Sequence, residues 1–298
     1  MRTSLLVLLL PLALLIGCPP AASGDDDDST PTPEANPPRA FAAYSGGSCP
    51  TLEDGRISFD SGGLSVSLDL YLPDNTDNAP VLFMWHWLGG SAADIGGAFA
   101  ADTIAQRKNA IVVAPDSWAN PTNEWNFNDF NDSTPELTFF DDMLSCLEEQ
   151  FDIDERRVYA TGMSAGGLWT TKLLFERADS LAAVVIYSGG TSATISYSTP
   201  AYPTPALLVW GGAPDVWPSQ QQVIIDFNSG MIDLGQRLAD DGHITVKCDH
   251  GLGHTIPNGG AEWLRSYLFE HSYAEGDSPF AKDDPSGDLP GYCVYSNQ

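Results

Sequence analysis

The stretch of sequence that decides the fold is residues 157–168, Arg-Val-Tyr-Ala-Thr-Gly-Met-Ser-Ala-Gly-Gly-Leu. Residues 158–160 predict a short buried strand, and residues 167–175 predict a helix. The turn between them, Gly162-Met163-Ser164-Ala165-Gly166, has the pattern G-x-S-x-G. In a strand–turn–helix context this turn exposes a strained serine beside a helix N-terminus, which can stabilise a developing negative charge. Ser164 is therefore the candidate nucleophile.

The rest of the chain alternates apolar runs with helical patterns. Helices are expected from Thr134 onward and over 221–238 and 261–269, and a hairpin over 57–59 and 64–72. Unbroken apolar runs between helices are typical of parallel strands that are buried on both faces. The fold class is therefore α/β, with a mostly parallel central sheet flanked by helices on both faces. The runs lie at 81–85, 110–114, 158–160, 182–187 and 206–210, with a weaker one at 243–247.

The first residues predict a targeting signal over 1–17. Arg2 precedes an apolar stretch that is too short to span a bilayer as a mature helix. The sequence Leu15-Ile16-Gly17-Cys18 resembles a bacterial lipobox, which implies that the Cys18 thiol is lipidated and that Cys18 becomes the new N-terminus after cleavage. With proline at position 19, the resemblance implies an exported protein that is lipid-anchored at the outer membrane. The alternative is an ordinary secretory peptide cleaved near residues 21–23, which gives a secreted or periplasmic protein.

Two further segments follow the predicted signal. Residues 18–45 are rich in proline and aspartate and contain almost no large apolar residue, so they predict a disordered tether. Residues 46–298 are long enough for one catalytic α/β domain.

Charge and cysteine content limit the function and the compartment. The formal net charge of −27 argues against nucleic acid as a partner, because phosphate backbones need cationic side chains. The same charge disfavours strongly acidic polysaccharides. Four cysteines remain besides Cys18, and an even number in an exported chain predicts two disulfides with three possible pairings. These cysteines are Cys49, Cys146, Cys248 and Cys293.

A serine nucleophile needs an acid and a histidine, each on a loop that follows a later strand. Asp215 follows the run 206–210 in such a loop, whereas Asp226 and Asp233 lie in a helical pattern. His254 is preferred as the base because a long loop must reach back to the serine, and His250 remains an alternative.

The pair His250-x-x-x-His254 could also suggest zinc. Gly251 and Gly253 break any helix there, however, and no glutamate lies between the histidines. We therefore expect no metal and no cofactor. For the oxyanion hole, one amide is that of Ala165, and the other should come from residues 86–91.

Four segments together resemble the polyhydroxybutyrate depolymerase and feruloyl esterase group of α/β-hydrolases. The resemblance implies serine-dependent hydrolysis of carboxylic esters with Ser164, Asp215 and His254 as the triad. The chain departs from the pattern at Trp87, where glycine is usual, and alignment makes Leu88 the second oxyanion donor. The segments are His86–Ser91, Gly162–Gly167, Trp210–Asp215 and Gly253–Pro257.

Tryptophans near these segments are candidate substrate contacts, and the polar and aromatic loop 120–132 is a candidate lid or pocket wall. The expected partner is a small-molecule or polymeric ester. The first hypothesis is a serine carboxylesterase, and the second is a serine peptidase or acyltransferase on the same triad. The third is a non-catalytic surface binding protein. The candidate tryptophans are Trp87, Trp118, Trp125, Trp169 and Trp217.

Overall fold

The computed structural model describes residues 37–118, 124–218, 224–274, 278–281 and 287–295, all within one compact unit of residues 35–298. Its centre is a nine-stranded sheet in the order β1-β2-β4-β3-β5-β6-β7-β10-β11. The strands from β4 to β10 run parallel, while β1, β2 and β11 pair antiparallel at the two edges. The strands are β1 Gly55–Ser61, β2 Leu64–Tyr71, β3 Ala79–Trp85, β4 Ile111–Pro115, β5 Ile153–Met163, β6 Ala183–Tyr187, β7 Ala206–Trp210, β10 Thr245–Asp249 and β11 Val294–Tyr295.

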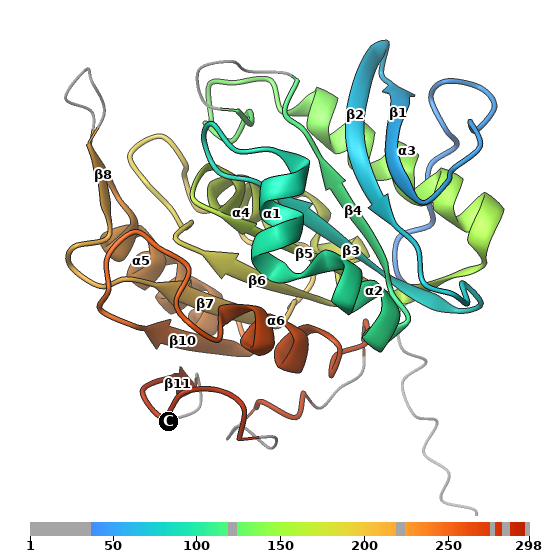
Figure 1. Ribbon diagram of the computed structural model, residues 1–298. Helices are drawn as coiled ribbons and strands as arrows, with labels where there is room; N and C mark the ends of the chain where they lie inside the picture. The colour runs from blue at the N-terminus through green and yellow to red at the C-terminus, as the bar shows by residue number, and fades with distance from the viewer. Residues whose placement is uncertain (1–36, 119–123, 219–223, 275–277, 282–286, 296–298) are drawn as a thin grey trace, which may run out of the picture. The chain divides into compact units, whose positions relative to one another are not determined.

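Helices cover both faces of this sheet (Figure 1). Residues of α1 (Ala92–Phe99), α2 (Ala101–Lys108) and α6 (Gly260–Leu268) belong to one apolar cluster. Residues of α3 (Thr134–Phe151), α4 (Ala165–Arg177) and α5 (Phe227–Asp240) belong to the other. Strand β3 joins the two, since its successive side chains point to opposite faces. The predicted α/β class with a mostly parallel sheet is confirmed.

The last part of the predicted tether contacts the domain. The Arg39 N–H donates to the Asp179 carbonyl at 2.8 Å, and its guanidinium pairs with Asp141 at 2.5 Å. The predicted signal, Cys18 and tether residues 18–36 lie outside the described residues. Within the described part of the chain, no helix is long and apolar enough to cross a membrane.

The helix expected over 221–238 differs from the structure at its start. Ile224–Asp226 form strand β9, which pairs antiparallel with β8 (Val216–Pro218), and α5 begins only at Phe227. Asp226 is the helix N-cap, because its carboxylate accepts the Ser229 N–H at 2.9 Å. Because aspartate is a preferred N-cap residue, the helix begins directly after Asp226 and does not extend back to residue 221. Residues 219–223 lie outside the described residues.

Two disulfides are present, as the cysteine content predicts. They join Cys49 to Cys146 and Cys248 to Cys293. The first connects the N-terminal segment to α3, and the second connects the end of β10 to the segment before β11. Both therefore attach a peripheral segment to the main sheet or to a helix that covers it.

The turn after β5 is packed backbone against backbone. A Cβ at Gly166 would lie 1.9 Å from the carbonyl oxygen of Trp85, at the end of β3. A Cβ at Gly162 would lie 2.2 Å from the carbonyl oxygen of Gly166. No side chain fits at either glycine, so the G-x-S-x-G pattern is required by the packing of the turn itself.

One acidic side chain, Glu136, is fully buried in the first turn of α3. Its carboxylate accepts hydrogen bonds from the Asn126 N–H at 3.0 Å and the Asn126 side-chain amide at 3.3 Å. Burial disfavours the ionised form more than these bonds favour it, and the pKa of Glu136 is raised to about 7.

Replacing Glu136 with glutamine should change how stability depends on pH. Because the pKa of Glu136 is raised in the folded state, the contribution of this residue to stability is fully present below about pH 4.5. That contribution is lost as pH rises through about 7, where the folded protein must bury the ionised carboxylate. We expect this loss to reach about 3 kcal/mol in the parent protein and to be absent in Glu136→Gln. Urea unfolding between pH 4.5 and 8 measures it, with the exposed Glu149→Gln as control. A variant-to-parent difference that stays constant with pH would contradict the assignment.

Candidate active site

Ser164 lies at the junction of β5 and α4. Its backbone has φ 59° and ψ −119°, a sparsely populated conformation that costs on the order of 1–3 kcal/mol. Its N–H donates to the Tyr187 carbonyl at 3.0 Å, which holds the junction against β6. The residue is 8% exposed and lines a cavity of about 320 Å³. The turn thus presents the hydroxyl to a cavity at the N-terminus of a helix.

The predicted acid and base lie beside this serine. The Ser164 hydroxyl donates to His254 Nε2 at 2.9 Å, and His254 Nδ1–H donates to the Asp215 carboxylate at 2.7 Å. Asp215 follows β7 and His254 follows β10, so the three side chains come from the carboxyl ends of three parallel strands. The structure brings all three predicted residues within hydrogen-bond distance.

Asp215 is completely buried, and its carboxylate is fully engaged. Besides His254, it accepts the Gly211 N–H at 2.8 Å and the Ser188 hydroxyl at 2.8 Å. Burial alone would raise the pKa of Asp215, but these hydrogen bonds outweigh it and hold the pKa below its ordinary value. The carboxylate therefore stays ionised beside the imidazole.

The His254 ring is held by aromatic neighbours. Phe227, the first residue of α5, stacks on it with ring centroids 4.5 Å apart, and Trp217 lies at 5.8 Å. His250, the alternative base, has its own Nδ1 engaged with the Leu252 N–H at 3.2 Å. The geometry therefore favours His254 over His250.

Two of the five candidate tryptophans line the cavity that contains Ser164. Trp87 and Trp217 form part of its wall, together with Leu88 and Ile256. Trp217 is 43% exposed and comes from the β8–β9 hairpin. These two residues are positioned to contact a bound molecule.

The other three tryptophans do not line this cavity. Trp125 and Trp169 are fully buried, and both pack edge-on against Trp85 of the core. Trp118 is half-buried and packs edge-on against Trp125. The prediction that these three tryptophans contact a substrate is therefore corrected. They pack against other aromatic side chains beneath the site. Of the predicted lid 120–132, residues 120–123 lie outside the described residues.

The two residues predicted to supply the oxyanion amides are both associated with the Ser164 cavity or turn. Ala165 is the first residue of α4, where amides lack intrahelical acceptors. Leu88 lines the same cavity as Ser164. Among the described residues, neither amide donates to another protein group. Their positions suit the expected role, which stays a prediction.

In the described ranges, no group of three or more histidine, cysteine, aspartate or glutamate side chains is arranged to hold a metal ion. His254 is engaged by Ser164 and Asp215.

Ser188 and Phe227 are site residues that the sequence reasoning missed. Ser188 directly follows the predicted strand 182–187, and polar residues at such strand ends are the signal that could have identified it. Phe227 gave no comparable signal, because its contact with His254 depends on where α5 begins.

Known proteins share sequence or fold with this chain. The model of the prolyl oligopeptidase family matches residues 101–222. Feruloyl esterase D of Neurospora crassa is 32% identical over 170 residues, covering 50% of this chain and 55% of that protein. Feruloyl esterase B of Thermothelomyces thermophilus is 28% identical over 153 residues, covering 49% and 52%. The chain thus spans about half the length of these relatives.

Solved structures give wider coverage at lower identity. The native form of a protein called pOPH has a TM-score of 0.61 and 21% identity, covering 83% of this chain and 96% of that one. An acetyl xylan esterase from Aspergillus awamori has a TM-score of 0.51 and 16% identity, covering 67% and 93%. The chain has the α/β-hydrolase fold. Ser164, at its strand–helix turn, lies where that fold places a nucleophile.

Ser188→Ala should lower both the stability and the kcat of the protein without abolishing activity. The change removes one hydrogen bond to a buried carboxylate, so the free energy of unfolding should fall by about 1–3 kcal/mol. Because Asp215 keeps its bonds to Gly211 and His254, kcat towards an ester should fall only about 3- to 10-fold with KM unchanged. Denaturation and steady-state kinetics test this, with the exposed Ser198→Ala as control. A kcat equal to that of the parent would show that Ser188 does not support Asp215.

Proposed function

We propose that this chain is a serine carboxylesterase that acts through an acyl-enzyme. The observation that carries the proposal is the hydrogen-bonded series Ser164–His254–Asp215, with distances of 2.9 and 2.7 Å. The likeness to feruloyl esterases over half the chain supports ester bonds as the target.

The geometry suits a two-step reaction. His254 Nε2 takes the proton of the Ser164 hydroxyl as its oxygen attacks the ester carbonyl, and Asp215 stabilises the imidazolium that forms. The amides of Ala165 and Leu88 donate to the oxyanion of the tetrahedral intermediate. His254 then protonates the leaving alcohol. Water attacks the acyl-enzyme by the same proton transfers in reverse order, which releases the acid.

The cavity favours a small neutral acyl group with apolar character. Its volume is about 320 Å³, and apolar side chains form most of its wall. An aromatic acid such as a hydroxycinnamoyl group, or a short aliphatic acid, matches that size and lining. The formal net charge of −27 disfavours anionic esters. We therefore infer activity on hydroxycinnamoyl and short-chain esters, and polyhydroxybutyrate is the polymeric candidate.

The decisive test replaces the nucleophile. Ser164→Ala should lower kcat/KM for p-nitrophenyl butyrate and methyl ferulate by at least about 10³-fold, because no acyl-enzyme can form. Polyhydroxybutyrate is included in the same panel, and the exposed Ser198→Ala is the matched control. Turnover that survives in folded Ser164→Ala protein would overturn the proposal.

A peptidase is the second candidate function, because the prolyl oligopeptidase family model matches residues 101–222. The same triad would cleave an amide through the same acyl-enzyme. Faster hydrolysis of peptide p-nitroanilides than of matched esters would favour this function. Failure of a fluorophosphonate probe to label Ser164 in folded protein would favour the third hypothesis, a surface binding protein.

We also propose that the mature protein is exported and anchored by lipid at Cys18. The lipobox-like sequence before Cys18 supports this, and the two disulfides fit an oxidising compartment. Residues 18–36 would then connect the anchor to the domain.

A further inference from the structure

The segment 86–90 between β3 and α1 carries the Leu88 amide. Its preceding carbonyl, that of Trp87, accepts two hydrogen bonds, from His86 Nδ1 at 2.8 Å and from the Gly90 N–H at 2.9 Å. The C=O and N–H groups of a trans peptide point in opposite directions. Both bonds therefore fix the direction of the Leu88 N–H.

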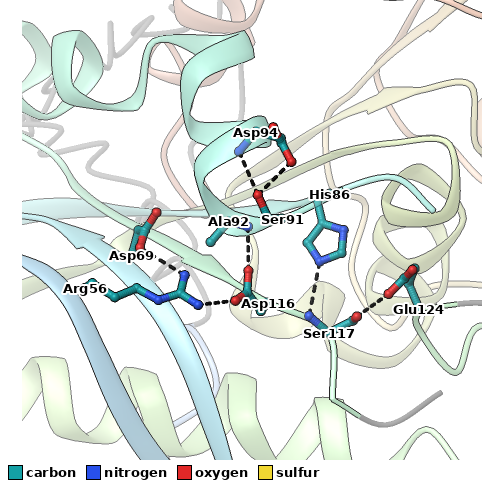
Figure 2. A network of polar contacts seen from close by, with 9 residues as sticks. All are labelled: Arg56, Asp69, His86, Ser91, Ala92, Asp94, Asp116, Ser117 and Glu124. Atoms are coloured by element: carbon teal, nitrogen blue, oxygen red, sulfur yellow. Dashed lines mark hydrogen bonds and ion pairs between the residues drawn. The ribbon is translucent and has the colours of Figure 1, made fainter. Parts of the chain in front are cut away.

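The start of this segment is fixed by the loop that follows β4. His86 is 1% exposed, and its Nε2 accepts the Ser117 N–H at 3.1 Å (Figure 2). The two contacts of the ring assign the proton to Nδ1 and leave Nε2 as an acceptor. Trp125 Nε1–H donates to the His86 carbonyl at 2.8 Å, and the two rings lie 4.8 Å apart.

The other end of the segment is held by Glu124. One carboxylate oxygen accepts the Gly89 N–H at 2.9 Å, and the other accepts the Ser117 hydroxyl. The Ser117 N–H also donates to His86, so hydrogen bonds connect His86, Ser117 and Glu124 (Figure 2). Through the Gly89 N–H, the same series returns to segment 86–90 on the other side of the Trp87–Leu88 peptide. Glu124 and Trp125, adjacent in sequence, thus hold opposite ends of segment 86–89.

We propose that Glu124 is a positioning residue for the oxyanion hole: its carboxylate ties Gly89 to Ser117 and thereby holds the Leu88 N–H towards the Ser164 cavity. The inference rests on the proposed esterase function. Glu124 would not contact the substrate. It would act through the Leu88 amide, which must be fixed before the reaction if it is to stabilise the oxyanion without reorganisation.

Asp94 supplies a matched control. This exposed carboxylate accepts the Ser91 hydroxyl at 2.7 Å at the start of α1 (Figure 2), and among the described residues its hydrogen bonds do not reach segment 86–90. Glutamine at position 124 supplies a conservative variant, because its carbonyl can accept the Gly89 N–H and its amide can donate to the Ser117 hydroxyl.

The experiment compares Glu124→Ala, Glu124→Gln and Asp94→Ala with the parent protein. For an ester that the parent hydrolyses, Glu124→Ala should lower kcat about 10- to 100-fold and change KM less than about 3-fold. Affinity for phenylboronic acid, which forms a tetrahedral adduct with a serine, should fall in parallel. Glu124→Gln and Asp94→Ala should stay within about 3-fold of the parent in both measurements. If Glu124→Ala melts below the assay temperature, Glu124→Leu takes its place.

The inference is overturned if folded Glu124→Ala keeps the kcat and the boronate affinity of the parent. It is also overturned if Glu124→Gln lowers kcat and boronate affinity as much as Glu124→Ala does. Glutamine keeps the hydrogen bonds to Gly89 and Ser117, so those bonds would then not position the Leu88 amide. A parent that hydrolyses no ester in the panel contradicts the proposed function instead. The boronate affinities still report separately on the amide.

Discussion

The close approach of α4 to the end of β3 is the constraint on which the site depends. With 1.9 Å between a hypothetical Cβ at Gly166 and the Trp85 carbonyl, the helix can sit there only because both glycines of the turn lack side chains. That approach forces the strained backbone of Ser164 and brings the helix N-terminus next to segment 86–90, which follows Trp85. The candidate nucleophile and both candidate oxyanion amides are therefore positioned by the same backbone contact.

Around this contact, buried polar groups hold the loops at the carboxyl edge of the sheet. Asp215 is satisfied by three donors, and Glu136 by the backbone and side chain of Asn126. Asn126 follows Trp125, whose indole holds the His86 carbonyl. Leaving a buried polar group without its partner costs more free energy than the hydrogen bond contributes to stability. The conformations of these loops are therefore determined more strongly than those of exposed loops.

Much of this arrangement could be predicted from sequence because its signals are local. The apolar runs identified the parallel strands, and the positions of Asp215 and His254 after such runs placed them at one edge of the sheet. Contacts between distant segments gave no such signal. The burial of Trp125 and Trp169, and the pairing of the four cysteines, follow from how loops and helices pack. The helix expected from residue 221 begins later because Asp226 caps it, a role that the helical pattern alone did not distinguish.

The disulfide Cys248–Cys293 has a consequence for the outer edge of the sheet. In the described part of the chain, β11 pairs with β10 through two residues, Val294 and Tyr295, which are too few to stay in place by ladder hydrogen bonds alone. The crosslink keeps that short strand over the backbone of β10. A chain with the bond reduced would uncover a row of unpaired amides and carbonyls, which is a template for strand addition by a second copy. This bond therefore protects the edge of the sheet against self-association.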